Sequence, residues 1–234
     1  MSYEEFVCHL LPFYTSPLVT IRIDPLGDEY KLPRALLCKQ SPYFRATFEG
    51  NFKESEEQLT TLSAEEGLVS LGSFHMLVQW IYLGRIIFVE SIPEEQITAI
   101  IEFLRIADMC GVTGMESLMA DHIKEIILAN PPKETVFATP PDKNTHFLTS
   151  HHIKFAVLLP KGHAVRKMLA SAAVKGYLLR DRSTFFEEIR RISDSALDLL
   201  GEVNVALESL EIEKRGMTFE DPISGQRVHL KGGF

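Results

Sequence analysis

The chain has 234 residues with a net charge of −8, and 45% of its residues are hydrophobic. A chain of this length can hold one large domain or two small ones, each with a buried core. The acidic balance disfavours direct binding to nucleic acid or anionic lipid. No apolar run reaches membrane-spanning length, and Glu4 and Glu5 stand where a secretory signal would be basic. We therefore expect a cytoplasmic or nuclear protein with no direct nucleic-acid or membrane partner.

The sequence offers little for catalysis or metal binding. Cys8, Cys38 and Cys110 lie far apart without metal-ligand spacing, which favours buried free thiols in a reducing compartment. The adjacent His151 and His152 would point apart on a helix, so they are poor joint metal ligands. Neither a phosphate-binding Gly-rich loop nor a Gly-x-Ser-x-Gly elbow is present. We expect no catalytic residue, no metal site and no cofactor.

The N-terminal elements begin with a short helix over residues 3–15 and continue into a hairpin. Residues 18–23 alternate between apolar and polar side chains, and residues 29–32 follow after the turn residues Pro25 and Gly27. This pattern predicts two antiparallel strands. The broad apolar face of the first helix is made of Phe6, Leu10, Leu11 and Phe13.

The next helix begins at Ser41, whose hydroxyl can cap it, and Pro42 suits its first position. Phe44 and Phe48 stand four residues apart on one face, and Gly50 ends the helix. A short, solvated edge strand is predicted at residues 58–62 within an acidic stretch.

Three further helices are predicted in the middle of the chain, over residues 73–83, 93–110 and 115–128, each with apolar residues at helical spacing. Residues 86–89 are rich in β-branched and aromatic side chains and predict another strand. A hairpin sheet followed by paired helices is an α+β arrangement.

The last third of the chain predicts a helical region. Pro-rich residues 131–150 indicate a linker, and a helix follows around residues 165–173. A longer helix is predicted over residues 189–210, with apolar residues alternating three and four apart. We expect this seam to pack inside a helical domain, and a coiled-coil-like dimer is the alternative. The candidate seam residues are Ile192, Leu199, Val203 and Leu210.

Several motifs occur in an order that resembles the BTB/POZ domain family. They are Ser41-Pro42-Tyr43-Phe44, the run from Phe74 through Trp80 to Gly84, and Ile106-Ala107-Asp108. The resemblance implies a BTB/POZ fold over residues 1–130, followed by the linker and an all-helical region over residues 151–213. Residues 214–234 are expected to form a tail or a small hairpin. This arrangement resembles BTB proteins of filamentous fungi.

The family resemblance implies a protein-interaction role with two sets of contact residues. Phe6, Leu10 and Phe13 are the expected homodimer interface, although Pro17 and Pro33 depart from the family pattern there. Phe52-Lys53-Glu54 occupies the place of the hydrophobic-x-Glu element with which some relatives contact a cullin scaffold of ubiquitin ligases. Phe52 can alternatively cap the domain core. The expected partner-binding residues are Phe52, Glu54, Tyr43 and Phe48.

Three functions remain open from the sequence. The first is an adaptor that self-associates or docks a partner such as a cullin-type ubiquitin-ligase scaffold. The second is a BTB scaffold or transcriptional co-regulator without a ubiquitin-ligase role. The third is an enzyme with a site between its domains, for which the sequence shows no convergent set of polar groups.

Overall fold

The computed structural model describes residues 3–64, 68–132, 142–179, 184–213 and 216–230. The chain divides into two compact units, and each takes two segments of the sequence. The first unit contains Met1–Val89 and Glu102–Gly114, and the second contains Glu90–Ile101 and Met115–Phe234. Helix α7 (Pro93–Cys110) therefore contributes its early turns to the second unit and its later turns to the first. The domain boundaries that we expect from the sequence stay a prediction.

The first unit begins with three consecutive helical segments where the sequence predicts one helix. They are α1 (Tyr3–Glu5), the π-helical turn η1 (Phe6–Leu10) and α2 (Leu11–Tyr14). None of these segments contains a buried residue. The start of the chain is thus helical but remains largely outside the core of its own unit.

The predicted hairpin is confirmed and forms most of a three-stranded sheet with the order β2-β1-β3. Strands β1 (Leu18–Asp24) and β2 (Asp28–Pro33) are antiparallel. Strand β3 (Leu59–Ser63) pairs parallel to β1 at the edge of the sheet, close to the predicted residues 58–62. Alternate residues of β1 point into the core, namely Val19, Ile21 and Ile23.

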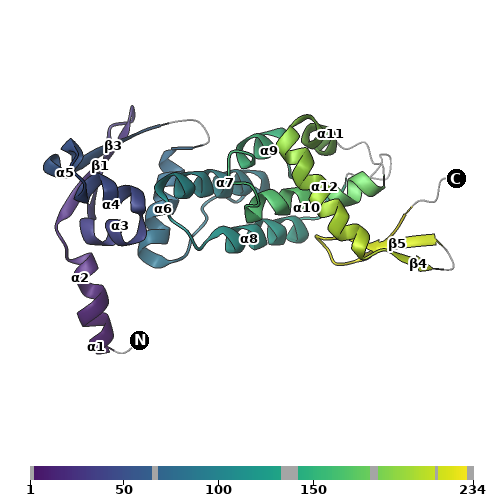
Figure 1. The fold of residues 1–234 in the computed structure, drawn as a ribbon, viewed down its shortest axis with the longest axis horizontal. Helices are drawn as coiled ribbons and strands as arrows, with labels where there is room; N and C mark the ends of the chain where they lie inside the picture. The colour runs from purple at the N-terminus through teal and green to yellow at the C-terminus, as the bar shows by residue number, and fades with distance from the viewer. Residues whose placement is uncertain (1–2, 65–67, 133–141, 180–183, 214–215, 231–234) are drawn as a thin grey trace. The chain divides into compact units, whose positions relative to one another are not determined.

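Helices pack against this sheet and against one another in the first unit (Figure 1). They are α3 (Arg34–Gln40), α4 (Pro42–Glu49), α5 (Lys53–Glu57) and α6 (Leu71–Leu83). Helix α6 starts with a reciprocal capping box between Ser70 and Ser73, which satisfies two backbone N–H groups at the helix start. It ends at Gly84, whose φ of 62° is left-handed.

The strand predicted at residues 86–89 is wrong, because this segment is neither helix nor strand in the structure. Its four apolar residues nevertheless alternate in burial. Ile86 and Phe88 are half-buried, whereas Ile87 and Val89 are exposed. Alternating burial shows that one side of an extended segment is covered. In this segment one side is covered although the segment does not join a sheet.

The second unit is built around α10 (Ala164–Leu178), most of whose length is buried. Helix α10 packs against the other described helices that lie wholly in this unit. These are α8 (Glu116–Ala129), α9 (Ser150–Ala156), α11 (Thr184–Arg191) and α12 (Ser193–Glu208). The prediction of one helix over residues 189–210 is wrong. The chain is extended at Ile192, which caps α12 with φ −103° and ψ 110° and so separates it from α11.

The end of the second unit is a three-stranded antiparallel sheet with the order β4-β5-β6. Its strands are β4 (Glu211–Glu213), β5 (Gly216–Glu220) and β6 (Arg227–His229). Phe219 and Ile223 are fully buried, and Asn144 donates a hydrogen bond from Nδ2 to Asp221 Oδ1 at 2.9 Å. Residues near the C-terminus are thus part of the core. Residues 133–141 of the predicted linker lie outside the described residues.

Because Phe219 is completely buried on β5, Phe219→Ala should lower the free energy of unfolding by about 3–5 kcal/mol. Met217→Ala on the same strand is the control, since Met217 is exposed and its loss should cost well under that amount. Urea unfolding of the full chain, followed by circular dichroism, measures both. Equal midpoints for the two variants would contradict a docked C-terminal sheet.

Candidate functional site

The hydroxyl of Ser41 fixes the start of α4 inside the first unit. Its Oγ accepts a hydrogen bond from the backbone N–H of Phe44 at 3.1 Å and donates one to the carbonyl of Cys110 at 2.6 Å. A Cβ on Gly111 would lie 3.1 Å from the Pro42 ring, so the end of α7 packs closely against the start of α4. One buried side chain thereby caps one helix and holds it to another.

The two phenylalanines of α4 lie in the core. The rings of Phe44 and Phe48 are stacked with centroids 6.1 Å apart, and both side chains are buried. Phe48 was expected to contact a partner, but the structure places its side chain in the core, where the apolar face of α4 meets the rest of the unit. Tyr43 is half-buried beside Phe44, with ring centroids 5.2 Å apart.

Phe52, by contrast, lies at the surface with 61% of its area exposed. A Cβ on Gly50 would lie 2.3 Å from the carbonyl oxygen of Ala46 and 3.0 Å from Cδ2 of Phe52. Only glycine therefore lets the chain turn this tightly with the Phe52 ring beside it. The carbonyl of Phe52 accepts from the Ser55 N–H at 3.0 Å, and the Ser55 hydroxyl donates to the carbonyl of Phe48 at 2.9 Å.

The surroundings of Phe52 are acidic. Glu54 lies exposed in the first turn of α5, where the helix dipole stabilises a negative charge. Lys53 forms an exposed ion pair with Glu57 at 3.0 Å, which raises the pKa of Lys53 above its ordinary value. The exposed carboxylates of α5 are those of Glu54, Glu56 and Glu57. An exposed aromatic ring next to acidic groups suits a basic partner surface.

The N-terminal helical segments form a second exposed apolar surface of the first unit. Phe6 is 40% exposed, and Leu10 and Phe13 are half-buried. The ammonium group of Lys39 lies 4.1 Å from the centroid of the Phe13 ring and partly covers that ring within the unit. Further exposed apolar side chains on these segments are Tyr3, Leu11 and Tyr14.

The predicted helical seam separates into buried and peripheral residues. Leu199 and Val203 are buried on α12, which packs against α10 within the second unit. Ile192 lies at the break before α12, and Leu210 follows its end, with both side chains half-buried. The structure therefore brings together two of the four predicted seam residues in one helix contact.

The described residues hold no group of three or more His, Cys, Asp or Glu side chains that could bind a metal ion. Burial raises the pKa of the Cys38 thiol to about 11 and that of the Cys110 thiol to about 12, so both stay protonated and unreactive near neutral pH. In the second unit, Arg166 is buried against Asp198, whose Oδ2 accepts from Nε at 2.8 Å. Arg166 also donates to the carbonyls of Val157 and Leu159, which makes it a structural brace.

His152 is buried and helps to join α9 to the early turns of α7. Its Nδ1 accepts from the Thr149 N–H at 3.1 Å. Its Nε2 lies 3.2 Å from the carbonyl of Glu94 and 3.0 Å from the hydroxyl of Thr98. A neutral ring with its proton on Nε2 satisfies these contacts, and burial lowers the pKa of His152 to about 4.

The fold and its exposed surfaces indicate the class of protein to which this chain belongs. A small sheet with short helices, carrying an exposed aromatic beside acids and an exposed apolar N-terminus, is typical of a protein-interaction domain. Comparison with protein-family models matches residues 18–126 to the BTB/POZ domain. The chain therefore contains a BTB/POZ domain, and that domain is a protein–protein interaction module, a kind not typically catalytic. No helix of the described part of the chain is long and apolar enough to cross a membrane.

The exposed side of α12, with Leu197, Leu200 and Leu207, was not among the predicted site residues. The predicted seam marked the inner side of this helix, but the sequence spacing gave no signal that these three leucines stay exposed.

The burial of neutral His152 predicts acid sensitivity. The unfolded chain binds a proton near pH 6.5 and the folded chain only near pH 4, so stability is full above pH 6.5 and falls as the pH drops toward 4. The free energy of unfolding should fall by about 3 kcal/mol in total, because each unit of pKa difference between the folded and unfolded states corresponds to about 1.4 kcal/mol. His152→Gln should flatten this slope between pH 6.5 and 5 in urea unfolding. A His152 ring that titrates near pH 6.5 by NMR would contradict the assignment.

Proposed function

We propose that this chain is a BTB adaptor that docks a cullin-type ubiquitin-ligase scaffold through Phe52 and Glu54. The observation that carries the proposal is the exposure of Phe52 at the position of the hydrophobic-x-Glu element. The ring lies beside Gly50, and the backbone of Phe52 is held by the hydrogen bond that its carbonyl accepts from Ser55, so the position of this residue is set before a partner arrives. A preordered anchor loses little conformational freedom on binding.

The proposal assigns different roles to the two side chains. Phe52 buries its ring in an apolar pocket of the scaffold and supplies most of the affinity. Glu54 pairs with a basic group of the scaffold, which sets the register of the contact and speeds association. Tyr43 lies half-buried on α4 and supports the edge of this surface, while Phe48 acts only through the core.

A second candidate function is a self-associating scaffold or co-regulator without a ubiquitin-ligase role. It is favoured by the apolar N-terminal segments, whose side chains find no buried position in their own unit. Exposed apolar surface of this kind is commonly covered by another protein chain. A homodimer through Phe6, Leu10 and Phe13 is compatible with the adaptor function, so the two proposals need separate tests.

Phe52→Ala should weaken binding of the full chain to a purified cullin scaffold subunit by about tenfold or more, since buried aromatic anchors contribute about 2 kcal/mol or more. Glu54→Ala should weaken it less and lower its dependence on salt. Leu26→Ala is the matched control, because Leu26 is exposed to a similar degree on the β1–β2 turn. Calorimetry measures all three.

The adaptor proposal is overturned if the wild-type chain shows no binding to the cullin subunit. It is also overturned if Phe52→Ala and Leu26→Ala bind equally well. The first outcome would leave the self-associating scaffold as the function of the BTB/POZ domain.

Phe6→Asp with Leu10→Asp should lower the mass of the full chain in solution by up to half, because two charges would be buried in the N-terminal contact. Light scattering over a concentration series measures the mass, and Leu26→Asp serves as the exposed control. Circular dichroism confirms that the variant keeps its fold. An unchanged mass would show that self-association does not require the N-terminal segments.

A further inference from the structure

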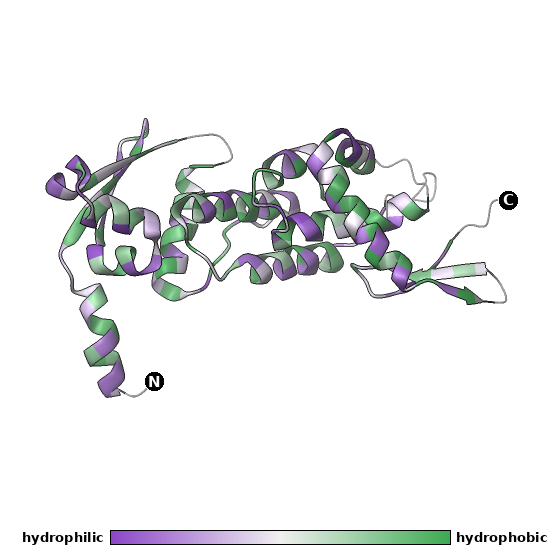
Figure 2. Ribbon diagram, viewed as in Figure 1, coloured by the Kyte–Doolittle hydropathy of each residue, from purple (hydrophilic) through white to green (hydrophobic). Residues whose placement is uncertain are grey.

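Helix α12 has two unlike sides, and only one is covered in the second unit. Its inner side packs on α10 through Leu199, Val203 and Ala206, all of them buried. Its outer side carries Leu197, Leu200 and Leu207, which are 63%, 49% and 42% exposed. Figure 2 shows apolar and polar residues interleaved along this helix, which joins α11 to the C-terminal sheet.

The exposed leucines form a regular stripe with an asparagine among them. Leu197, Leu200, Asn204 and Leu207 follow one another at spacings of three, four and three residues, and we call them the outer stripe. This spacing is that of the a and d positions of a heptad, with leucine at both d positions and asparagine at the second a position. Asn204 is exposed, and no atom lies within 4 Å of a Cβ built on the neighbouring Gly201.

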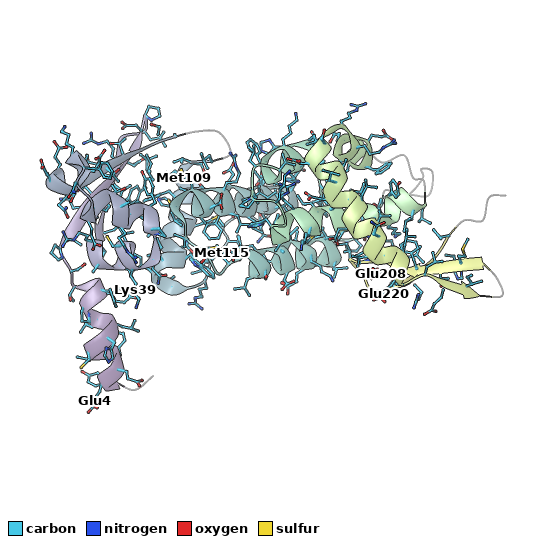
Figure 3. The ribbon with its side chains drawn as sticks, in the orientation of Figure 1. Glu4, Lys39, Met109, Met115, Glu208 and Glu220 are labelled. Carbon is cyan, nitrogen blue, oxygen red and sulfur yellow. The ribbon has the colours of Figure 1, made fainter. Side chains whose placement is uncertain are left out.

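The charges of α12 are turned away from the outer stripe. The helix carries four acidic residues and no basic one. Three of the acids contact other elements of the second unit: Asp194 with Lys161 at 3.4 Å, Asp198 with Arg166 at 2.7 Å, and Glu202 with Ser171 at 2.6 Å. Glu208 alone lies near the end of the stripe (Figure 3). An acidic helix would repel its own copy, but here three of the four acids are held on other sides.

We propose that the outer stripe pairs with the outer stripe of a second copy of this chain, with the two α12 helices parallel. A parallel two-fold pair sets each leucine against its own copy and Asn204 against Asn204. An antiparallel pair would set Leu200 against Asn204. An apolar helix from another protein would leave the amide of Asn204 buried without a hydrogen-bond partner, at a cost of about 1–3 kcal/mol.

Two heptads are too short for an isolated coiled coil in water. Here, however, α12 is already helical and is fixed to α10 by buried side chains and by the Arg166–Asp198 ion pair. Association therefore costs no helix formation and orders few side chains. The contact is independent of the proposed cullin docking and of the N-terminal surface, since it uses neither set of residues.

Disulfide trapping tests the parallel contact directly. Asn204→Cys in the full chain, with Cys8→Ser to remove the exposed native thiol, should form a dimer on mild oxidation. Residues that face each other across a two-fold axis come within the Cα separation of about 7 Å that a disulfide requires. Val205→Cys is the matched control, because Val205 is exposed on the same helix but points about 100° away.

The expected result is a dimer yield at residue 204 that is about fivefold or more above that at residue 205, given the distance limit of a disulfide. Equal yields overturn the proposal. A second measurement compares the solution masses of Leu200→Asp and Val205→Asp, each in a chain that also carries Phe6→Asp and Leu10→Asp so that the N-terminal surface cannot hold the dimer. Leu200→Asp should lower the mass by up to half and Val205→Asp should leave it unchanged. Equal masses for these two variants also overturn it.

Discussion

The first unit depends on the two hydrogen bonds of Ser41. Its hydroxyl satisfies the N–H of Phe44 and the carbonyl of Cys110 together, so the start of α4 is fixed to the end of α7. That placement sends Phe44 and Phe48 into the core and brings α4 to its end at Gly50. The exposed ring of Phe52 follows directly, so a buried contact determines where a surface side chain stands.

The second unit uses one central helix in a comparable way. Helix α10 is buried along most of its length, and two of its polar side chains are paired with acidic groups of α12. Arg166 of α10 is satisfied by Asp198 and two backbone carbonyls, and Ser171 donates to Glu202. Because these contacts engage the acids of α12, its remaining exposed surface is largely apolar.

The sequence was enough to predict the hairpin, the helix start at Ser41 and most helix positions. Each of these features depends on residues that are only a few positions apart in the chain. The sequence was not enough for residues 86–89 or for the break at Ile192, since both depend on which elements are available to pack nearby. The same limit applied to the sites. Phe48 and Phe52 are equally aromatic in sequence, but only the tertiary structure buries one and exposes the other.

The division of the chain into units has a covalent consequence. The sequence passes from one unit to the other at residues 89–90, 101–102 and 114–115, and the middle crossing falls inside α7. Domains that are joined by a single linker can be released by one cut. Here no single peptide-bond cleavage separates both units intact, because a cut at residues 89–90 or 114–115 keeps one unit whole but divides the other. Truncation at either point therefore removes a segment from one of the two units.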